Sequence, residues 1–184
     1  MGDFLTVPEL PSYLQVPSVD TTTANLLIGM AEASVRVYCG WNISAETVTN
    51  QVVEPVGYDL FLPTLRLTAV ASIVDNGVTL DAATAYQWRS NGHVRLRSRS
   101  SLSWWPPQLT VTYTHGLAAG AKELTVVKQV VASAVSRLIG NPSVLQQMQV
   151  GDVMEQYAVA PQVPAGLLYS EQAALGSFRL YAIA

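Results

Sequence analysis

The chain has 184 residues, which is enough for one well-buried core and short for two independent ones. Hydrophobic residues make up 49% of the sequence and charged residues only 12%, against roughly 25% in an average soluble protein, so we expect much of its surface to face other subunits. The net charge of -3 argues against a protein whose main role is to coat nucleic acid, because such proteins usually contain a basic domain.

The sequence also disfavours membrane, secreted and disulfide-linked proteins. Lys128 and Arg137 interrupt the longest apolar stretch, 124 to 139, so no run reaches the roughly 18 residues that a membrane span needs. The N-terminal stretch carries Asp3 and no basic region, so we expect no secretory signal and a soluble chain that stays inside the cell that makes it. Cys39 is the only cysteine, which excludes an internal disulfide, and we expect it to be a small buried side chain.

The first predicted elements are helical. Residues 7 to 20 hold three prolines and predict a short helix or turn. Asp20 is a good N-cap for a long helix over residues 21 to 39, and Gly40 is a natural stop. One face of this helix carries the side chains at spacings of three and four, namely Ile28, Ala31, Val35 and Tyr38.

Residues 50 to 115 predict antiparallel strands, because short apolar or alternating runs are broken by turn dipeptides at intervals of about ten residues. Asn91-Gly92 lies inside YQWRSNGHVRLRS and predicts a hairpin, and Asn76-Gly77 predicts another. The segment QLTVTYTH alternates strictly, so we expect one buried face and a threonine face that is wet or paired. The expected buried residues are Leu109, Val111 and Tyr113.

Helical spacing returns after Gly116. A core helix is predicted within 117 to 149, followed by an extended, proline-containing segment over 150 to 166 and a terminal helix that includes Gly176. The buried face of the core helix is expected to consist of Leu124, Val127, Val131, Ala134 and Leu138.

Together these elements predict the α+β class. We expect a helical base, made of the long N-terminal helix, the second long helix and a C-terminal helix or arm, with an inserted antiparallel β block. A single domain is expected over residues 1 to 184. Its parts are the N-terminal helices (1–45), the inserted β block (46–116), the core helix (117–149) and the extended segment with the C-terminal arm (150–184).

Candidate catalytic and metal-binding residues are few. His115 ends a strand and precedes a glycine, as a general base at a sheet end would, but no motif supplies a nucleophile or an acid partner, and we interpret it as structural. Asp75 and Asp81 flank a turn, where aspartate is ordinary. Asp152 and Glu155 are too few for a cation site. We therefore predict no enzyme, no metal and no cofactor.

Positive charge is concentrated in one hairpin, which carries four of the ten basic residues. Three of the four are spaced by two, so on a strand they line one face together with His93. Three interpretations stay open: a solvated face, an ion-paired contact with an acidic face of another subunit, and a contact with the phosphate backbone of nucleic acid. The four residues are Arg89, Arg95, Arg97 and Arg99.

Trp104 and Trp105 supply a large apolar surface at an expected loop, just before two prolines. We favour a role in capping the sheet. The alternative is that they anchor a partner, since tryptophan is a common hot-spot residue.

Five segments follow one another in a recognisable series. The first segment is the expected long helix with an aromatic turn, DTTTANLLIGMAEASVRVYCGWNI, and the second is a strand pair, LFLPTLRLTAVASIVDNGVTL. A hairpin, YQWRSNGHVRLRS, and a strand, WPPQLTVTYTHG, come next. The last is a helix end with the segment that follows it, LIGNPSVLQQMQVGDVMEQYA. Their order and spacing resemble the head-to-tail adaptor (head completion or connector) proteins of long-tailed bacteriophages with double-stranded DNA. The resemblance covers nearly the whole chain, although no single segment is specific by itself.

The resemblance implies a structural virion protein of the head-tail interface, made in the cytoplasm of the host bacterium. Such adaptors form a ring, typically dodecameric, beneath the portal protein. The ring extends the DNA channel and presents a surface to the next connector, stopper or tail protein. Genomic DNA passes through the channel without sequence-specific binding, and no membrane is involved.

The resemblance also implies contact residues. Residues 166 to 184 would be the arm that reaches the portal, with contacts from Leu168, Leu175, Phe178, Arg179, Leu180 and Tyr181. The hairpin near 86 to 99 would contact a neighbouring subunit or another protein, with Arg89, Arg95, Arg97, Arg99, Trp104 and Trp105 as the contact residues. The arginines and the tryptophan pair are not general features of the family, so their roles stay open.

Two alternatives belong to other classes of protein. A nucleic-acid-contacting module would use the Arg89–Arg99 hairpin and would bind duplex DNA with a strong dependence on salt. A small hydrolase would depend on His115, and its turnover would be lost on replacing that residue.

Overall fold

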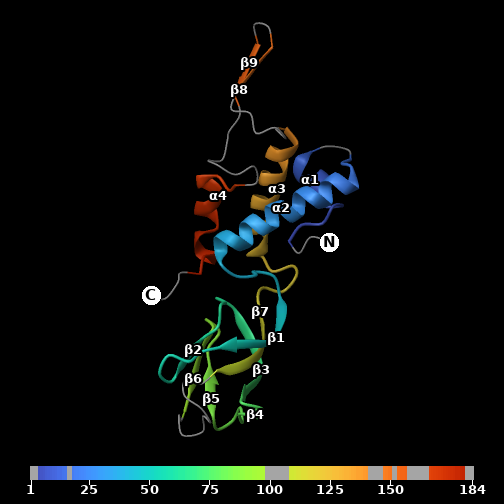
Figure 1. Ribbon diagram of the computed structural model, residues 1–184. Coiled ribbons are helices and arrows are strands. Elements are labelled where there is room, and N and C mark those ends of the chain that lie inside the picture. The colour runs from blue at the N-terminus through green and yellow to red at the C-terminus, as the bar shows by residue number, and fades with distance from the viewer. Residues whose placement is uncertain are drawn as a thin grey trace. The chain divides into compact units, whose positions relative to one another are not determined.

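A computed structural model describes residues 4–15, 18–97, 108–140, 147–150, 153–156 and 166–180 (Figure 1). The chain forms two compact units. The helical unit comprises Met1–Cys39 and Gly120–Arg179, and the β unit comprises Gly40–Ala119 and Leu180–Ala184. The predicted α+β class is confirmed, with β structure inserted between helices that pack on each other.

The helical unit contains four α-helices among the described residues, and α2 packs against α3. They are α1 (Leu10–Leu14), α2 (Thr21–Cys39), α3 (Leu124–Gly140) and α4 (Tyr169–Ala174), followed by a 3-10 turn at Gly176–Phe178. The predicted helix over 21 to 39 is confirmed, and the Thr23 backbone N–H donates to the Asp20 carboxylate at 2.8 Å as an N-cap should. The five α3 residues expected in the core are all buried. No helix in the described part of the chain is both long and apolar enough to cross a membrane.

A buried carboxylate ties the N-terminal segment to α2. Glu32 lies on the inner face of α2 and accepts hydrogen bonds from the backbone N–H groups of Phe4 at 2.8 Å and Leu5 at 3.2 Å. The Arg36 guanidinium reaches the same carboxylate at 3.4 Å and also lies over the Phe4 ring. Glu32 thus satisfies backbone donors that no helix or strand would satisfy.

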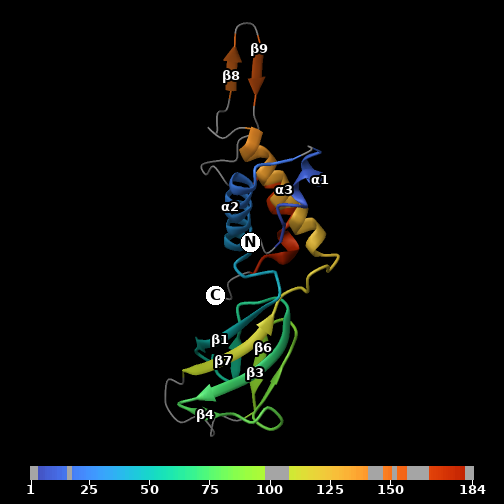
Figure 2. The ribbon, with the colours of Figure 1, turned by 90° about the vertical axis from the view of Figure 1, so that its right-hand side faces the viewer.

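The β unit is built from two antiparallel sheets. The larger has the order β1-β7-β3-β4 and the smaller the order β2-β6-β5, so β7 is a central strand (Figure 2). In the register, Tyr113 lies opposite Val48 on one side and Val70 on the other. The strands are β1 (Glu46–Val53), β2 (Asp59–Phe61), β3 (Leu67–Asp75), β4 (Val78–Thr79), β5 (Tyr86–Trp88), β6 (His93–Leu96) and β7 (Leu109–His115).

The alternation predicted along β7 is confirmed. Leu109, Val111 and Tyr113 are buried, and the threonines between them are half-buried. Two of the β7 threonines also form polar contacts: the Thr112 hydroxyl accepts from the Asn50 N–H at 3.3 Å, and the Thr114 hydroxyl lies 3.1 Å from that of Thr47. The core between the two sheets contains Leu60, Leu62, Leu67, Ile73, Leu80, Tyr86, Val94, Leu96, Leu109, Val111 and Tyr113.

Both predicted hairpins are present. Asn76 and Gly77 take positive φ angles of 45° and 85° between β3 and β4, as the tightest hairpin turns require. β5 pairs with β6 across residues 89 to 92, which include Asn91-Gly92.

The C-terminal third differs from the prediction in two places. Strands β8 (Gln147–Val150) and β9 (Val153–Gln156) pair as an antiparallel hairpin, where a helix end and an extended segment were expected. The terminal helix is short: α4 ends at Ala174, and a 3-10 turn starts at Gly176, a poor helix residue.

The two ends of the β block lie side by side in a stem. Ala45 N–H donates to the Leu117 carbonyl at 2.9 Å, and Leu117 N–H donates to the Ile43 carbonyl at 2.7 Å. Gly116 lies in this stem with φ of +98°, and a Cβ built there would lie 2.1 Å from the Ser44 carbonyl oxygen. Only glycine permits this close approach of two backbones.

We expect Gly116→Ala to unfold the β unit far more easily than a matched glycine replacement. Gly57 also has a positive φ, +70°, but no atom lies within 4 Å of its built Cβ. Gly57→Ala should therefore lower the free energy of unfolding by about 1 kcal/mol, the left-handed penalty alone. Gly116→Ala adds a backbone clash and should cost about 3 kcal/mol or more. Urea unfolding followed by circular dichroism measures both, and equal losses would contradict the tight stem.

Candidate interaction surfaces

One face of the smaller sheet carries the predicted positive stripe. Along β6, Val94 and Leu96 point into the core, whereas His93 is half-buried and Arg95 exposed on the other side. Arg97 continues the outer row and is exposed. Arg89, from the turn after β5, lines the same hollow as these residues. The predicted common face is thus confirmed for its described members, His93, Arg95 and Arg97. We call these three residues together with Arg89 the arginine face. Arg99, Trp104 and Trp105 lie outside the described residues.

The arginine face is concave. A hollow of about 400 Å³ is lined by all four of its residues together with Gln87 and the 40% exposed indole of Trp88. A second hollow of about 300 Å³ shares Gln87, Arg95 and Arg97 with the first. The two hollows therefore meet along the row formed by these three residues.

Two carboxylates lie near the arginine face: Asp59 pairs with His93 of that face, and Asp81 is bonded within its own turn. The His93 Nε2 atom lies 2.7 Å from Asp59 Oδ1, and the His93 ring stacks on Phe61 with centroids 5.3 Å apart. Asp81 accepts hydrogen bonds from the Thr84 hydroxyl at 2.6 Å and the Ala83 N–H at 3.1 Å, which together lower its pKa. Among the described residues, no carboxylate pairs with Arg89, Arg95 or Arg97.

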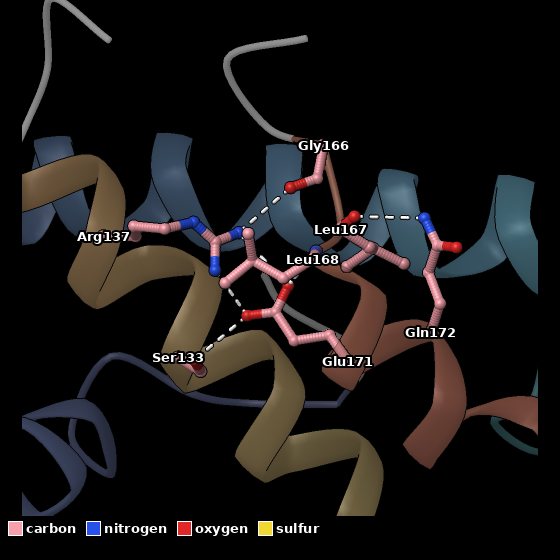
Figure 3. A network of polar contacts seen from close by, with 7 residues as sticks. All are labelled: Ser133, Arg137, Gly166, Leu167, Leu168, Glu171 and Gln172. Atoms are coloured by element: carbon pink, nitrogen blue, oxygen red, sulfur yellow. Dashed lines mark hydrogen bonds and ion pairs between the residues drawn. The ribbon is translucent and has the colours of Figure 1, made fainter. Parts of the chain in front are cut away.

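A polar network holds the C-terminal segment on α3 (Figure 3). The Glu171 carboxylate is 6% exposed and accepts from the Arg137 guanidinium, from the Ser133 hydroxyl at 3.0 Å and from the Leu168 N–H at 2.8 Å. Arg137 also donates to the Gly166 carbonyl at 3.0 Å. The network joins α3 to the start and first turn of α4.

The predicted portal-contact residues differ in accessibility. Leu175 has no exposed surface, because it packs inside the helical unit. Leu168, Phe178 and Leu180 are half-buried. Arg179 is exposed, and its guanidinium lies over the Tyr38 ring at 5.3 Å. Tyr181 lies outside the described residues. The contact with a portal stays a prediction for these residues.

His115 is a core residue of the β unit. It is 3% exposed and lies between Trp41 and Tyr113, with ring centroids 6.0 and 5.4 Å away. Desolvation lowers its pKa, and nearby Glu46 opposes this shift. Its Nδ1 atom has no hydrogen-bond partner among the described residues. A buried imidazole has no access to a substrate, which fits the structural interpretation.

Metal and thiol chemistry find no support in the described residues. No group of three or more histidine, cysteine, aspartate or glutamate side chains comes together there as a metal site would require. Cys39 is fully buried as predicted, and burial raises the pKa of its thiol to about 11. Such a thiol is inert at neutral pH.

The sequence interpretation missed several of these contacts. Asp59 and Phe61 belong to a strand far from the hairpin in sequence, and nothing in the sequence indicated that β2 pairs with β6. Glu171 and Arg137 are separated by 34 positions. Glu32 gave a signal that was overlooked: it lies four residues after Ile28 and three before Val35, on the apolar face of its helix.

In sequence, no family model and no curated protein matches the chain. In structure, the chain is similar to known proteins. The fold is similar to a chain in the neck of an empty gene transfer agent particle computed with C6 symmetry, with a TM-score of 0.59, 14% identity, and coverage of 98% of this chain and 92% of that one. A chain in the virion of a native gene transfer agent particle gives a TM-score of 0.59 and 15% identity at the same coverage. At such identities the likeness concerns the fold.

We expect Glu171→Ala to release α4 from α3. The substitution leaves Arg137 partly buried without its carboxylate, and breaking such a pair costs about 3 kcal/mol of unfolding free energy. Glu171→Gln should cost less, because the amide keeps one acceptor, and the exposed Ser170→Ala is the neutral control. Limited proteolysis with mass spectrometry should detect faster cleavage around residues 166 to 180. Unchanged cleavage in Glu171→Ala would show that the network does not hold this segment.

Stability should fall on mild acidification because of His115. Its pKa in the folded state lies below the ordinary value of 6.5, so the unfolded chain binds a proton at a pH where the folded chain does not. The contribution of neutral His115 to the free energy of unfolding is therefore complete above pH 6.5 and is lost as the pH falls below it. His115→Phe should flatten the change in unfolding free energy between about pH 7.5 and 5.5. Urea unfolding of both proteins at each pH provides the comparison, and parallel curves would refute it.

Proposed function

We propose that this chain is a structural component of the neck of a tailed, phage-like particle, where it acts as a head-to-tail adaptor. The observation that carries the proposal is the fold: a helical unit with an inserted β unit, similar over 98% of this chain to a chain of a gene transfer agent neck. The sequence series that resembles bacteriophage adaptors supports it independently. The role is mechanical, and no catalytic step is assigned to any residue.

A ring of identical copies is the assembly that we propose, and the resemblance to bacteriophage adaptors favours twelve copies. The neck that contains the similar chain was computed with C6 symmetry, with which rings of six and of twelve copies are both compatible. The surface of α2 supports burial between copies, because the exposed apolar residues Leu26, Met30 and Val37 share one side of the helix. Only 12% of the residues are charged, which suits a subunit enclosed by others.

The ring would join a portal protein on one side to the next connector, stopper or tail protein on the other, and DNA would pass through its channel. We propose residues 166 to 184 as the portal-facing arm. The accessible candidates among the described residues are Leu168, Phe178, Arg179 and Leu180. The fully buried Leu175 supports the arm from inside the helical unit.

The test is sedimentation of a lysate in which the chain is naturally produced, with mass spectrometry across the gradient. We expect the chain to travel with DNA-filled particles at a low, constant copy number relative to the major shell protein. If tailed particles sediment without it while the chain stays in the soluble fraction, the adaptor function is wrong.

The same gradient tests the arm. Arg179→Glu should reduce the amount of chain on particles, because it reverses an exposed charge in the arm. Lys122→Glu is the matched control, since it reverses an exposed charge of the same unit outside the arm. Equal occupancy of the two variants would remove the arm assignment and leave the neck function in place.

A further inference from the structure

The three arginines of the arginine face form no ion pair with a carboxylate in the described part of the chain. Arg89, Arg95 and Arg97 line one hollow and lack a carboxylate partner there. We propose that this face binds an acidic polypeptide segment of a partner protein, whose aspartate or glutamate side chains enter the hollow and pair with the guanidinium groups.

The chemistry of the lining fits carboxylates. A guanidinium presents parallel N–H donors that match the two oxygens of a carboxylate, and such pairs are among the strongest polar contacts in proteins. Gln87 lies opposite Arg95 in the strand register and adds an amide that donates or accepts. Asp59 lies opposite Arg95 in the strand register, but its ion pair is with His93 and not with Arg95, and Asp81 is bonded to Thr84.

The shape of the surface indicates how the segment would lie. The hollows of about 400 and 300 Å³ share Arg95 and Arg97, so the positive charge follows a short trough rather than a single point. Trp88 gives the larger hollow an apolar wall, against which the methylene groups of a glutamate would pack. A short extended segment with several acidic residues fits a trough of this kind.

A protein segment is favoured over duplex DNA by charge and by shape. The β unit between residues 40 and 119 carries five arginines and five carboxylates, so it lacks the net positive charge on which duplex binding depends, and binding must come from short-range pairing inside the hollow. The hollow of about 400 Å³ has the size of a pocket for side chains, whereas the phosphates of a duplex form an extended row along its backbone. One aromatic ring close to the arginines, Phe61, is already stacked on His93.

The binding surface rests on the β unit alone and does not depend on the neck function. The experiment uses the full chain and measures fluorescence anisotropy of a labelled oligoglutamate peptide at low salt. Arg95→Gln should weaken binding roughly tenfold, because it removes the charge where the two hollows meet. Arg66→Gln is the matched control, since Arg66 is an exposed arginine of the same unit outside both hollows.

Each result decides the proposal. Oligoglutamate binding that is lost in Arg95→Gln and kept in Arg66→Gln supports it, and circular dichroism verifies that both variants are folded. No binding, or equal loss in both variants, overturns it. A short labelled DNA duplex is measured in parallel: tighter binding of the duplex, lost in Arg95→Gln, would replace the acidic segment with DNA as the ligand. None of these outcomes changes the sedimentation result that tests the neck function.

Discussion

The β unit depends on the strict alternation along β7. This strand pairs with β1 on one side and β3 on the other, and every second residue from Leu109 to Tyr113 lies in the core. A slip of one residue in either pairing would place threonine hydroxyls in the core and expose a tyrosine. The chain then continues from β7 through Gly116 and Leu117 toward α3, so the same strand also fixes where the β block ends.

Periodic patterns in the sequence were sufficient to predict the elements that bury one face. The long helices α2 and α3 each carry an apolar stripe over several turns, and β7 alternates without interruption. The two hairpin turns follow from Asn-Gly pairs, whose backbone preference is local. The common face of Arg95 and Arg97 follows from the period of a strand. The sequence therefore predicted the candidate surface, but not that it is hollow.

Other features were missed, one of them despite a local signal. Gln147 to Val150 alternates between polar and apolar residues, and the dipeptide Gly151-Asp152 separates β8 from β9 in the sequence, as in a two-residue hairpin. The bonds that Glu32 and Glu171 accept join segments about 30 positions apart, and their existence depends on how the helices pack. The larger hollow is lined by the β5–β6 hairpin and Ala82, and its depth depends on how these side chains lie, which no sequence period describes.

The stem at the two ends of the β block would allow the block to be exchanged as one piece during evolution. Residues 43 to 45 and Leu117 are bonded to each other, so the first and last backbones of the block emerge together at one point. Because its two ends are adjacent, the block can be replaced by one of different sequence without lengthening either connection to the helical unit. Recombination at the stem would therefore replace the β unit while the sequence of the helical unit stays the same.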